Sequence, residues 1–193
     1  MKRRIGLRIG IIAFVVLIAG ATILYNSLKE RVPADAVPPG AGGDSGASSQ
    51  AGAQKAQDFA MTDRDGKTVQ LSELLAGGKP AVLNFWASWC PPCKAEMPDF
   101  DKQYQAVGGD VQFIMVNITD GQRETVESAS AFIAEQGFSF PVYFDTLQQG
   151  SAAYLGGYIP ATFFIDRDGN IASSREGQLT EQMLLEGIAL ITG

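Results

Sequence analysis

The chain has 193 residues, of which 46% are hydrophobic, which is enough for one folded domain with additional segments. Its formal net charge is −6: residues 1–57 hold seven Lys/Arg and three Asp/Glu, whereas residues 58–193 hold eight and eighteen. An acidic body argues against nucleic acid as a partner, and the lack of histidine excludes a histidine-ligated zinc site and a Ser-His-Asp or Cys-His nucleophile.

The first 31 residues have the pattern of a membrane signal-anchor. Four cations, Lys2, Arg3, Arg4 and Arg8, precede an uncharged stretch from Ile9 to Leu28, which is long enough to cross a bilayer as a helix. The positive-inside tendency places the N-terminus in the cytoplasm. We therefore predict a single-pass protein of the cell membrane whose remaining chain lies in the periplasm or outside the cell.

A cleaved signal peptide is the alternative, because Ala19-Gly20-Ala21 has the form of a cleavage site. The apolar run continues past this site through Ile23 and Leu24, which favours an anchor that is retained. A lipoprotein is excluded because no cysteine is present there for acylation.

Residues 32–57 are rich in Pro, Gly, Ala, Ser and Gln and contain almost no large apolar side chain. Such a composition cannot bury enough surface to fold, so we predict a flexible linker.

From residue 58 to residue 193 the sequence alternates strand and helix patterns. The predicted strands cover residues 59–61, 68–70, 81–86, 111–116, 142–144, 161–165 and 171–175, and the predicted helices residues 91–107, 123–136 and 181–190. Gly137 ends the second helix, Thr180 caps the third, and Pro98 should bend the first. The order predicts an α/β domain with a central mixed β-sheet flanked by helices and an added N-terminal β-hairpin.

Cys90 and Cys93 are the only cysteines, and they lie where the strand 81–86 passes into the helix 91–107. At such a turn the helix dipole favours a thiolate, which suits reversible disulfide chemistry. A lone C-x-x-C could also be half of a zinc site, but no second pair completes one, so no metal is predicted.

Two motifs together resemble the TlpA/ResA branch of the thioredoxin-like proteins. They are Asn84-Phe-Trp-Ala-Ser-Trp-Cys-Pro-Pro-Cys-Lys-Ala-Glu-Met-Pro98 and Gly157-Tyr-Ile-Pro-Ala-Thr162, the latter before a Phe-Phe-Ile-Asp strand. The resemblance implies a thioredoxin-like fold and a membrane-tethered thiol-disulfide oxidoreductase that reduces apocytochrome c or other exported proteins. It also implies a membrane electron donor of the DsbD/CcdA type, and a cis Ile159-Pro160 bond beside the cysteines.

In this chemistry we expect Cys90, next to solvent, to attack the substrate disulfide and Cys93, facing inward, to resolve the mixed disulfide. The Cys90-Cys93 disulfide is then the redox group, and no cofactor is expected. If Cys90 is the N-cap of the helix, Pro91 and Pro92 offer it no N–H, so the N–H of Cys93 is the main donor. We therefore expect only moderate stabilisation of the thiolate.

Substrate contacts are predicted at Trp89, Pro91, Pro92, Ile159 and Pro160. Trp89 offers a flat apolar surface beside Cys90, and Ile159 presents its backbone to an extended segment. The alternatives are ordinary packing for the tryptophan, a good helix start for the two prolines, and a tight turn at Ile159-Pro160.

Glu96 is the candidate acid/base. Thioredoxin has a buried Asp where this chain has Asn84, and some relatives have a Glu where this chain has Pro91, so Glu96 is the nearest carboxylate beyond Cys93. The alternative is a solvated glutamate, or a partner of Lys94 or Lys102.

Three other functions remain open. The same dithiol could work as an oxidase, because the sequence does not give the redox potential. Two thiolates could also bind Cu(I), although neither histidine nor a methionine near the pair supports this. A peroxidase is disfavoured because Trp86-Ala87-Ser88-Trp89 stands where Thr and Pro would be expected.

Overall fold

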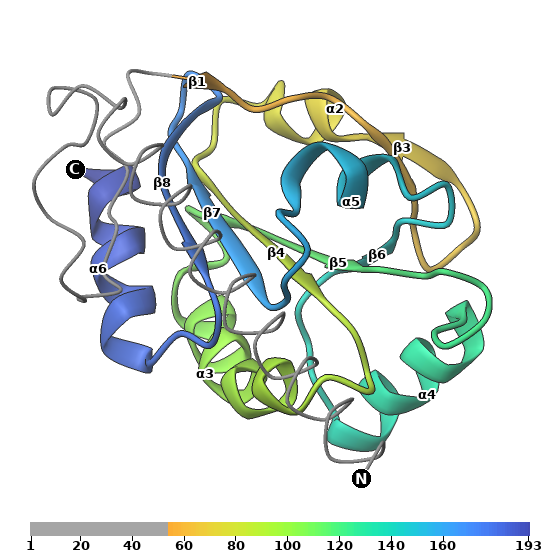
Figure 1. Ribbon diagram of the computed structural model, residues 1–193. Coiled ribbons are helices and arrows are strands. Elements are labelled where there is room, and N and C mark those ends of the chain that lie inside the picture. Colours follow the sequence, from red (N-terminus) through yellow and green to blue (C-terminus); the bar gives the residue numbers. More distant parts are fainter. Residues whose placement is uncertain (1–53) are drawn as a thin grey trace, which may run out of the picture. The chain divides into compact units, whose positions relative to one another are not determined.

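The computed structural model describes residues 54–193, which form a mixed β-sheet with helices on both faces (Figure 1). The predicted anchor and nearly all of the predicted linker lie outside these residues. Within the described part, no helix is both long enough and apolar enough to span a membrane.

The sheet has eight strands in the spatial order β1-β8-β7-β4-β5-β6-β2-β3. β4 is parallel to β5 and β5 to β6, whereas the other neighbouring pairs are antiparallel. The strands are β1 (Gln54–Lys55), β2 (Ala60–Thr62), β3 (Thr68–Gln70), β4 (Ala81–Trp86), β5 (Gln112–Asn117), β6 (Val142–Phe144), β7 (Ala161–Ile165) and β8 (Asn170–Glu176). The mixed sheet and its added hairpin, β2–β3, confirm the predicted fold class.

Strand β4 lies in the middle of the sheet and is buried along its whole length. Its side chains alternate between two hydrophobic clusters, because successive residues of a strand point to opposite faces. Val82 and Trp86 belong to one cluster, and Leu83 and Phe85 to the other.

The helices are α2 (Leu71–Leu75), α3 (Pro91–Val107), α4 (Val126–Gln136), α5 (Gln149–Tyr154) and α6 (Glu181–Thr192). Side chains of α3, α4 and α6 pack into the cluster with Val82, and side chains of α2 and α5 into the cluster with Leu83. The buried positions of α3 include Cys93, Met97 and Phe100, a spacing of three to four residues that places them on one face.

Helix α4 begins at Val126, three residues later than predicted, although Gly137 ends it in the left-handed conformation as expected. The difference arises at Asp120, whose Oδ1 accepts from the backbone N–H groups of Gln122, Arg123 and Glu124. This side chain holds a separate turn, and Thr125 then caps the helix.

Gln54 and Lys55, which the composition placed in the linker, form β1 and pair with β8. Ala56 continues this pairing by donating its N–H to the carbonyl of Gly169. The ordered body thus begins earlier than predicted, because polar residues can pair with a sheet edge through their backbone alone. The short helices α2 and α5 were not predicted either.

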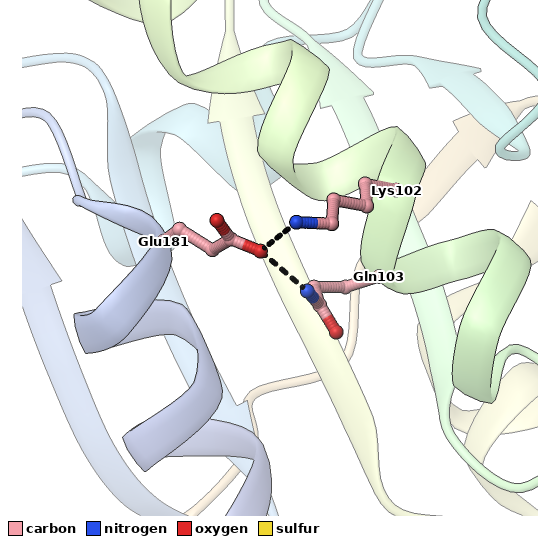
Figure 2. A network of polar contacts seen from close by, with 3 residues as sticks. All are labelled: Lys102, Gln103 and Glu181. Carbon is pink, nitrogen blue, oxygen red and sulfur yellow. Dashed lines mark hydrogen bonds and ion pairs between the residues drawn. The ribbon is translucent and has the colours of Figure 1, made fainter.

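The helices α3 and α6 meet at a polar contact (Figure 2). Glu181, the first residue of α6, accepts from Lys102 Nζ at 2.6 Å and from Gln103 Nε2 at 3.1 Å, both on α3. The ion pair lowers the pKa of Glu181 and raises that of Lys102. Since both side chains are well exposed, this contact contributes little to stability, and the apolar side chains that α3 and α6 contribute to one cluster hold the two helices together.

Candidate active site

The two cysteines lie where β4 ends and α3 begins. Cys90 is the N-cap of α3 in an extended backbone conformation, followed by Pro91 and Pro92 in the first turn. Its Sγ accepts from the backbone N–H of Cys93 at 3.3 Å. The prolines have no N–H to offer, so this single donor is what the helix start provides to the sulfur.

Cys90 and Cys93 form a disulfide, with 5.3 Å between their Cα atoms. Cys93 faces inward and is fully buried, as predicted. Cys90, however, is only 2% exposed, so the expectation that it lies next to solvent is wrong for this disulfide state. The side chains of Trp89 and Ile159 pack against the hydrophobic cluster that contains both cysteines.

The loop before β7 lies beside the disulfide. The Ile159-Pro160 peptide bond is cis, and the carbonyl oxygen of Ile159 is 3.9 Å from Sγ of Cys90, so both features implied by the resemblance are present. Pro160 is buried, whereas Tyr158, two residues before it, is 70% exposed.

The residues predicted to contact substrate differ in exposure. Pro91 is exposed, while Pro92, Trp89 and Ile159 are half-buried. The guanidinium carbon of Arg123 lies 3.4 Å from the centre of the Trp89 ring, so part of this ring is already covered by a cation.

Glu96 lies one helical turn after Cys93 on the buried face of α3 and is 1% exposed. Its Oε1 accepts from Asn84 Nδ2 at 2.9 Å, and its Oε2 accepts from the backbone N–H of Leu179 at 2.8 Å. The alternative of a solvated or lysine-paired glutamate is therefore wrong, and the partner of Lys102 is Glu181.

Burial raises the pKa of Glu96 to about 7, and this effect outweighs the two hydrogen bonds, which favour the charged form. The nearby charge of Asp99 adds slightly to the rise. Glu96 can therefore gain or lose a proton near neutral pH, as an acid/base in this region would need to do.

Asn84 connects Glu96 to the neighbouring strand. Asn84 in β4 lies directly opposite Thr162 in β7, and its Nδ2 also donates to Thr162 Oγ1 at 3.0 Å. Its Oδ1 is buried and has no hydrogen-bond partner among the described residues.

A second buried carboxylate was not identified from the sequence. Glu124, in the loop between β5 and α4, is fully buried and accepts from Ser88 in the turn before Cys90. Because Glu124 is distant in sequence and lay inside a predicted helix, no local spacing pattern pointed to it. In residues 54–193, no three metal-binding side chains come together.

A central mixed sheet, a disulfide at the start of a helix and a cis-proline loop beside it together define a thioredoxin-like thiol-disulfide oxidoreductase. Comparisons with known proteins agree with this class. Residues 53–174 match the model of the AhpC/TSA family. The thiol-disulfide oxidoreductase ResA of Bacillus subtilis is 32% identical over 191 residues, which cover 98% of this chain and 94% of that protein.

Solved structures agree as well. StoA from Bacillus subtilis is 28% identical, with a TM-score of 0.58 over 68% of this chain and 96% of that one. The exposed lipoprotein thioredoxin of Streptococcus pneumoniae is 30% identical, with a TM-score of 0.56 over 69% of this chain and 98% of that one. The chain therefore belongs to the AhpC/TSA family, and within it to the ResA-like thiol-disulfide oxidoreductases.

Proposed function

We propose that this protein is a reductase of disulfides in exported proteins, such as apocytochrome c. The observation that carries this proposal is the single N–H donor at Sγ of Cys90, since Pro91 and Pro92 supply none. A thiolate with few donors is stabilised only moderately, and a dithiol whose reduced form is not strongly stabilised gives up its electrons more readily. This favours reduction over oxidation of a substrate.

The reaction proceeds through two exchanges. The thiolate of Cys90 attacks one sulfur of the substrate disulfide, so that a mixed disulfide forms and the other substrate sulfur leaves as a thiolate. Cys93 then loses its proton and attacks Sγ of Cys90, which releases the second substrate thiol. Two electrons have moved to the substrate, and the Cys90-Cys93 disulfide remains as the only redox group used.

Glu96 is proposed as the acid/base that exchanges the proton of Cys93. The two residues are three apart on one face of α3, which brings their side chains to adjacent positions. Its pKa of about 7 lets the carboxylate accept a proton and return it without a large free-energy cost at neutral pH.

The substrate is proposed to lie against Trp89, Pro91, Pro92 and the Ile159-Pro160 loop. An extended segment of the substrate pairs with the backbone of Ile159, whose carbonyl oxygen lies beside Cys90. Because Cys90 is 2% exposed in the disulfide state, its sulfur must become more accessible in the reduced protein before it meets substrate.

We further propose that the apolar stretch of residues 9–28 acts as a membrane anchor that holds the protein at the outer face of the cell membrane, with its N-terminus in the cytoplasm. The length of this apolar stretch supports the membrane anchor, and the cations that precede it support the orientation. The pneumococcal relative, which is described as an exposed lipoprotein, also supports an external location. A membrane carrier of the DsbD/CcdA type would then return electrons to the disulfide.

Trapping tests this function. In the full-length Cys93→Ala protein, Cys90 should hold exported proteins as mixed disulfides that dithiothreitol releases, and mass spectrometry identifies them. The Cys90→Ala protein is the matched control and should trap none. Recovery of the same proteins with both variants, or of none with Cys93→Ala, would contradict the proposal.

A further inference from the structure

Glu124 holds the turn that precedes the redox cysteines. Its Oε1 accepts from the backbone N–H of Ser88 at 2.8 Å and from Asn117 Nδ2 at 2.7 Å, and its Oε2 accepts from Ser88 Oγ at 2.7 Å. The carboxylate is fully buried. A buried charge is tolerated only where hydrogen-bond donors surround it. The fold can therefore bury this carboxylate only if these three hydrogen bonds are made.

The same loop contacts the next residue of the turn as well. Arg123 covers the ring of Trp89 with its guanidinium group, while Glu124 binds Ser88. Two consecutive residues of the loop thus contact two consecutive residues before Cys90. Glu124 is also tied to the sheet, because Asn117, which donates to its carboxylate, is the last residue of β5.

Ser88 is close enough to Cys90 for its placement to matter. Two residues of chain separate their Cα atoms by about 7 Å at most, and no regular element intervenes before α3 begins. A shift of the Ser88 backbone is therefore passed on to the N-cap residue. Thiol-disulfide exchange needs the attacking sulfur in line with the bond that breaks. The rate of exchange is therefore sensitive to the position and direction of Sγ of Cys90.

We propose that Glu124 is a positioning residue for disulfide exchange: by holding both the N–H and the hydroxyl of Ser88, it sets the position from which Cys90 meets a substrate disulfide. This role rests on the proposed function, and it does not require Glu124 to touch a reacting atom. A purely structural role would instead affect the stability of the fold and leave the reactivity of folded protein unchanged.

The replacements Glu124→Ala and Glu124→Gln separate these roles. Alanine removes all three hydrogen bonds, whereas glutamine can keep them, because its Oε1 still accepts from Ser88 N–H and Asn117 while its Nε2 donates to Ser88 Oγ. The measurement is the second-order rate constant of the reduced protein with oxidised glutathione, taken at a temperature where thermal unfolding curves show every variant to be folded. We expect Glu124→Ala to lower the rate constant on the order of tenfold or more and Glu124→Gln to restore it to within about threefold of the wild type.

Asp145→Ala is the matched control. Asp145 is also fully buried and likewise accepts from both the N–H and the hydroxyl of one serine, Ser151, but it holds the start of α5. This variant should lose thermal stability while keeping the wild-type rate constant. If Glu124→Ala does not fold, Ser88→Ala, which loses only the hydroxyl contact, should still react severalfold more slowly than wild type.

Three results would overturn the positioning role. They are a folded Glu124→Ala protein that reacts at the wild-type rate, a Glu124→Gln protein that is as slow as Glu124→Ala, and an Asp145→Ala protein that slows equally. Failure of the proposed function looks different, because the wild-type protein itself would then not exchange with glutathione.

Discussion

Asn84 donates its side-chain amide to Glu96 across 2.9 Å, and both residues are buried, Asn84 in β4 and Glu96 on the helix that carries the redox cysteines. An ionised Glu96 needs a donor here, whereas a protonated one offers an O–H and needs an acceptor. Oδ1 of Asn84, which has no partner within residues 54–193, is such an acceptor, and a half-turn of the amide would present it to Glu96. One side chain can therefore serve both protonation states of a carboxyl group whose pKa is about 7.

The first prediction concerns turnover and pH. Between pH 6 and pH 8 the wild-type rate should change as Glu96 titrates, because its pKa of about 7 lies in this range. Glu96→Gln should abolish that change, since an amide does not titrate. Reduction of a disulfide-bonded peptide, followed across this range, provides the measurement, and identical profiles for the two proteins would remove Glu96 from the mechanism.

The second prediction concerns stability and pH. Burial raises the pKa of Glu96 from 4.5 to about 7, so the folded protein holds this proton more tightly than the unfolded chain does. The resulting contribution is full below pH 4.5 and is lost as the pH rises to about 7. The free energy of unfolding of the wild type, relative to Glu96→Gln, should therefore fall by about 3 kcal/mol across this window, as urea denaturation can measure.

Glu181→Gln is the control for this measurement. Contact with Lys102 lowers the pKa of Glu181, so its contribution has the opposite sign and is lost as the pH falls. Because Glu181 is on the surface, we expect only a small effect. A fall of the same sign and size in both comparisons would show that the dependence does not arise at Glu96.

The third prediction concerns the number of N–H donors at Cys90. Pro92→Ala adds a backbone N–H at the second position of α3, from which an N-cap side chain commonly accepts. The extra donor should stabilise the thiolate, raise the reactivity of Cys90 toward iodoacetamide near pH 6, and shift the reduction potential to less negative values.

Pro98→Ala is the matched control for this substitution, since Pro98 lies inside α3 and away from the cap. Its potential against glutathione should stay at the wild-type value. The donor argument would fail if Pro92→Ala had an unchanged or more negative potential.

The fourth prediction concerns packing between α6 and β7. A Cβ placed on Gly187 would lie 2.1 Å from Cζ of Phe164, which is itself buried in the core. Gly187→Ala should therefore overpack this contact and lower the free energy of unfolding by about 1–3 kcal/mol. Gly77→Ala, where a Cβ would meet no described residue within 4 Å, should change the free energy of unfolding far less in the same denaturation experiment.

Local patterns predicted most of the strands and the long helices. The continuous apolar run of β4, the proline-led start of α3 and the Thr180 cap of α6 each depend on neighbours within a few residues. The same reasoning missed β1, because Gln54 and Lys55 form a strand only where β8 offers them an edge. It also began α4 too early, because Arg123 and Glu124 are residue types that favour helices, although the Asp120 side chain holds them in a separate turn.

The sequence by itself determined where the redox chemistry lies: two cysteines three residues apart at a helix start, with prolines that remove N–H donors. These properties act over one helical turn, so residue order is sufficient to predict them. Only the tertiary structure decided the setting of the carboxylates. The buried Glu96 accepts a hydrogen bond from the backbone N–H of Leu179, 83 residues away, and Glu124 accepts one from Ser88 across 36 residues. Burial and hydrogen bonding of a charge depend on which distant segments the fold brings around it, and they set both its pKa and its role.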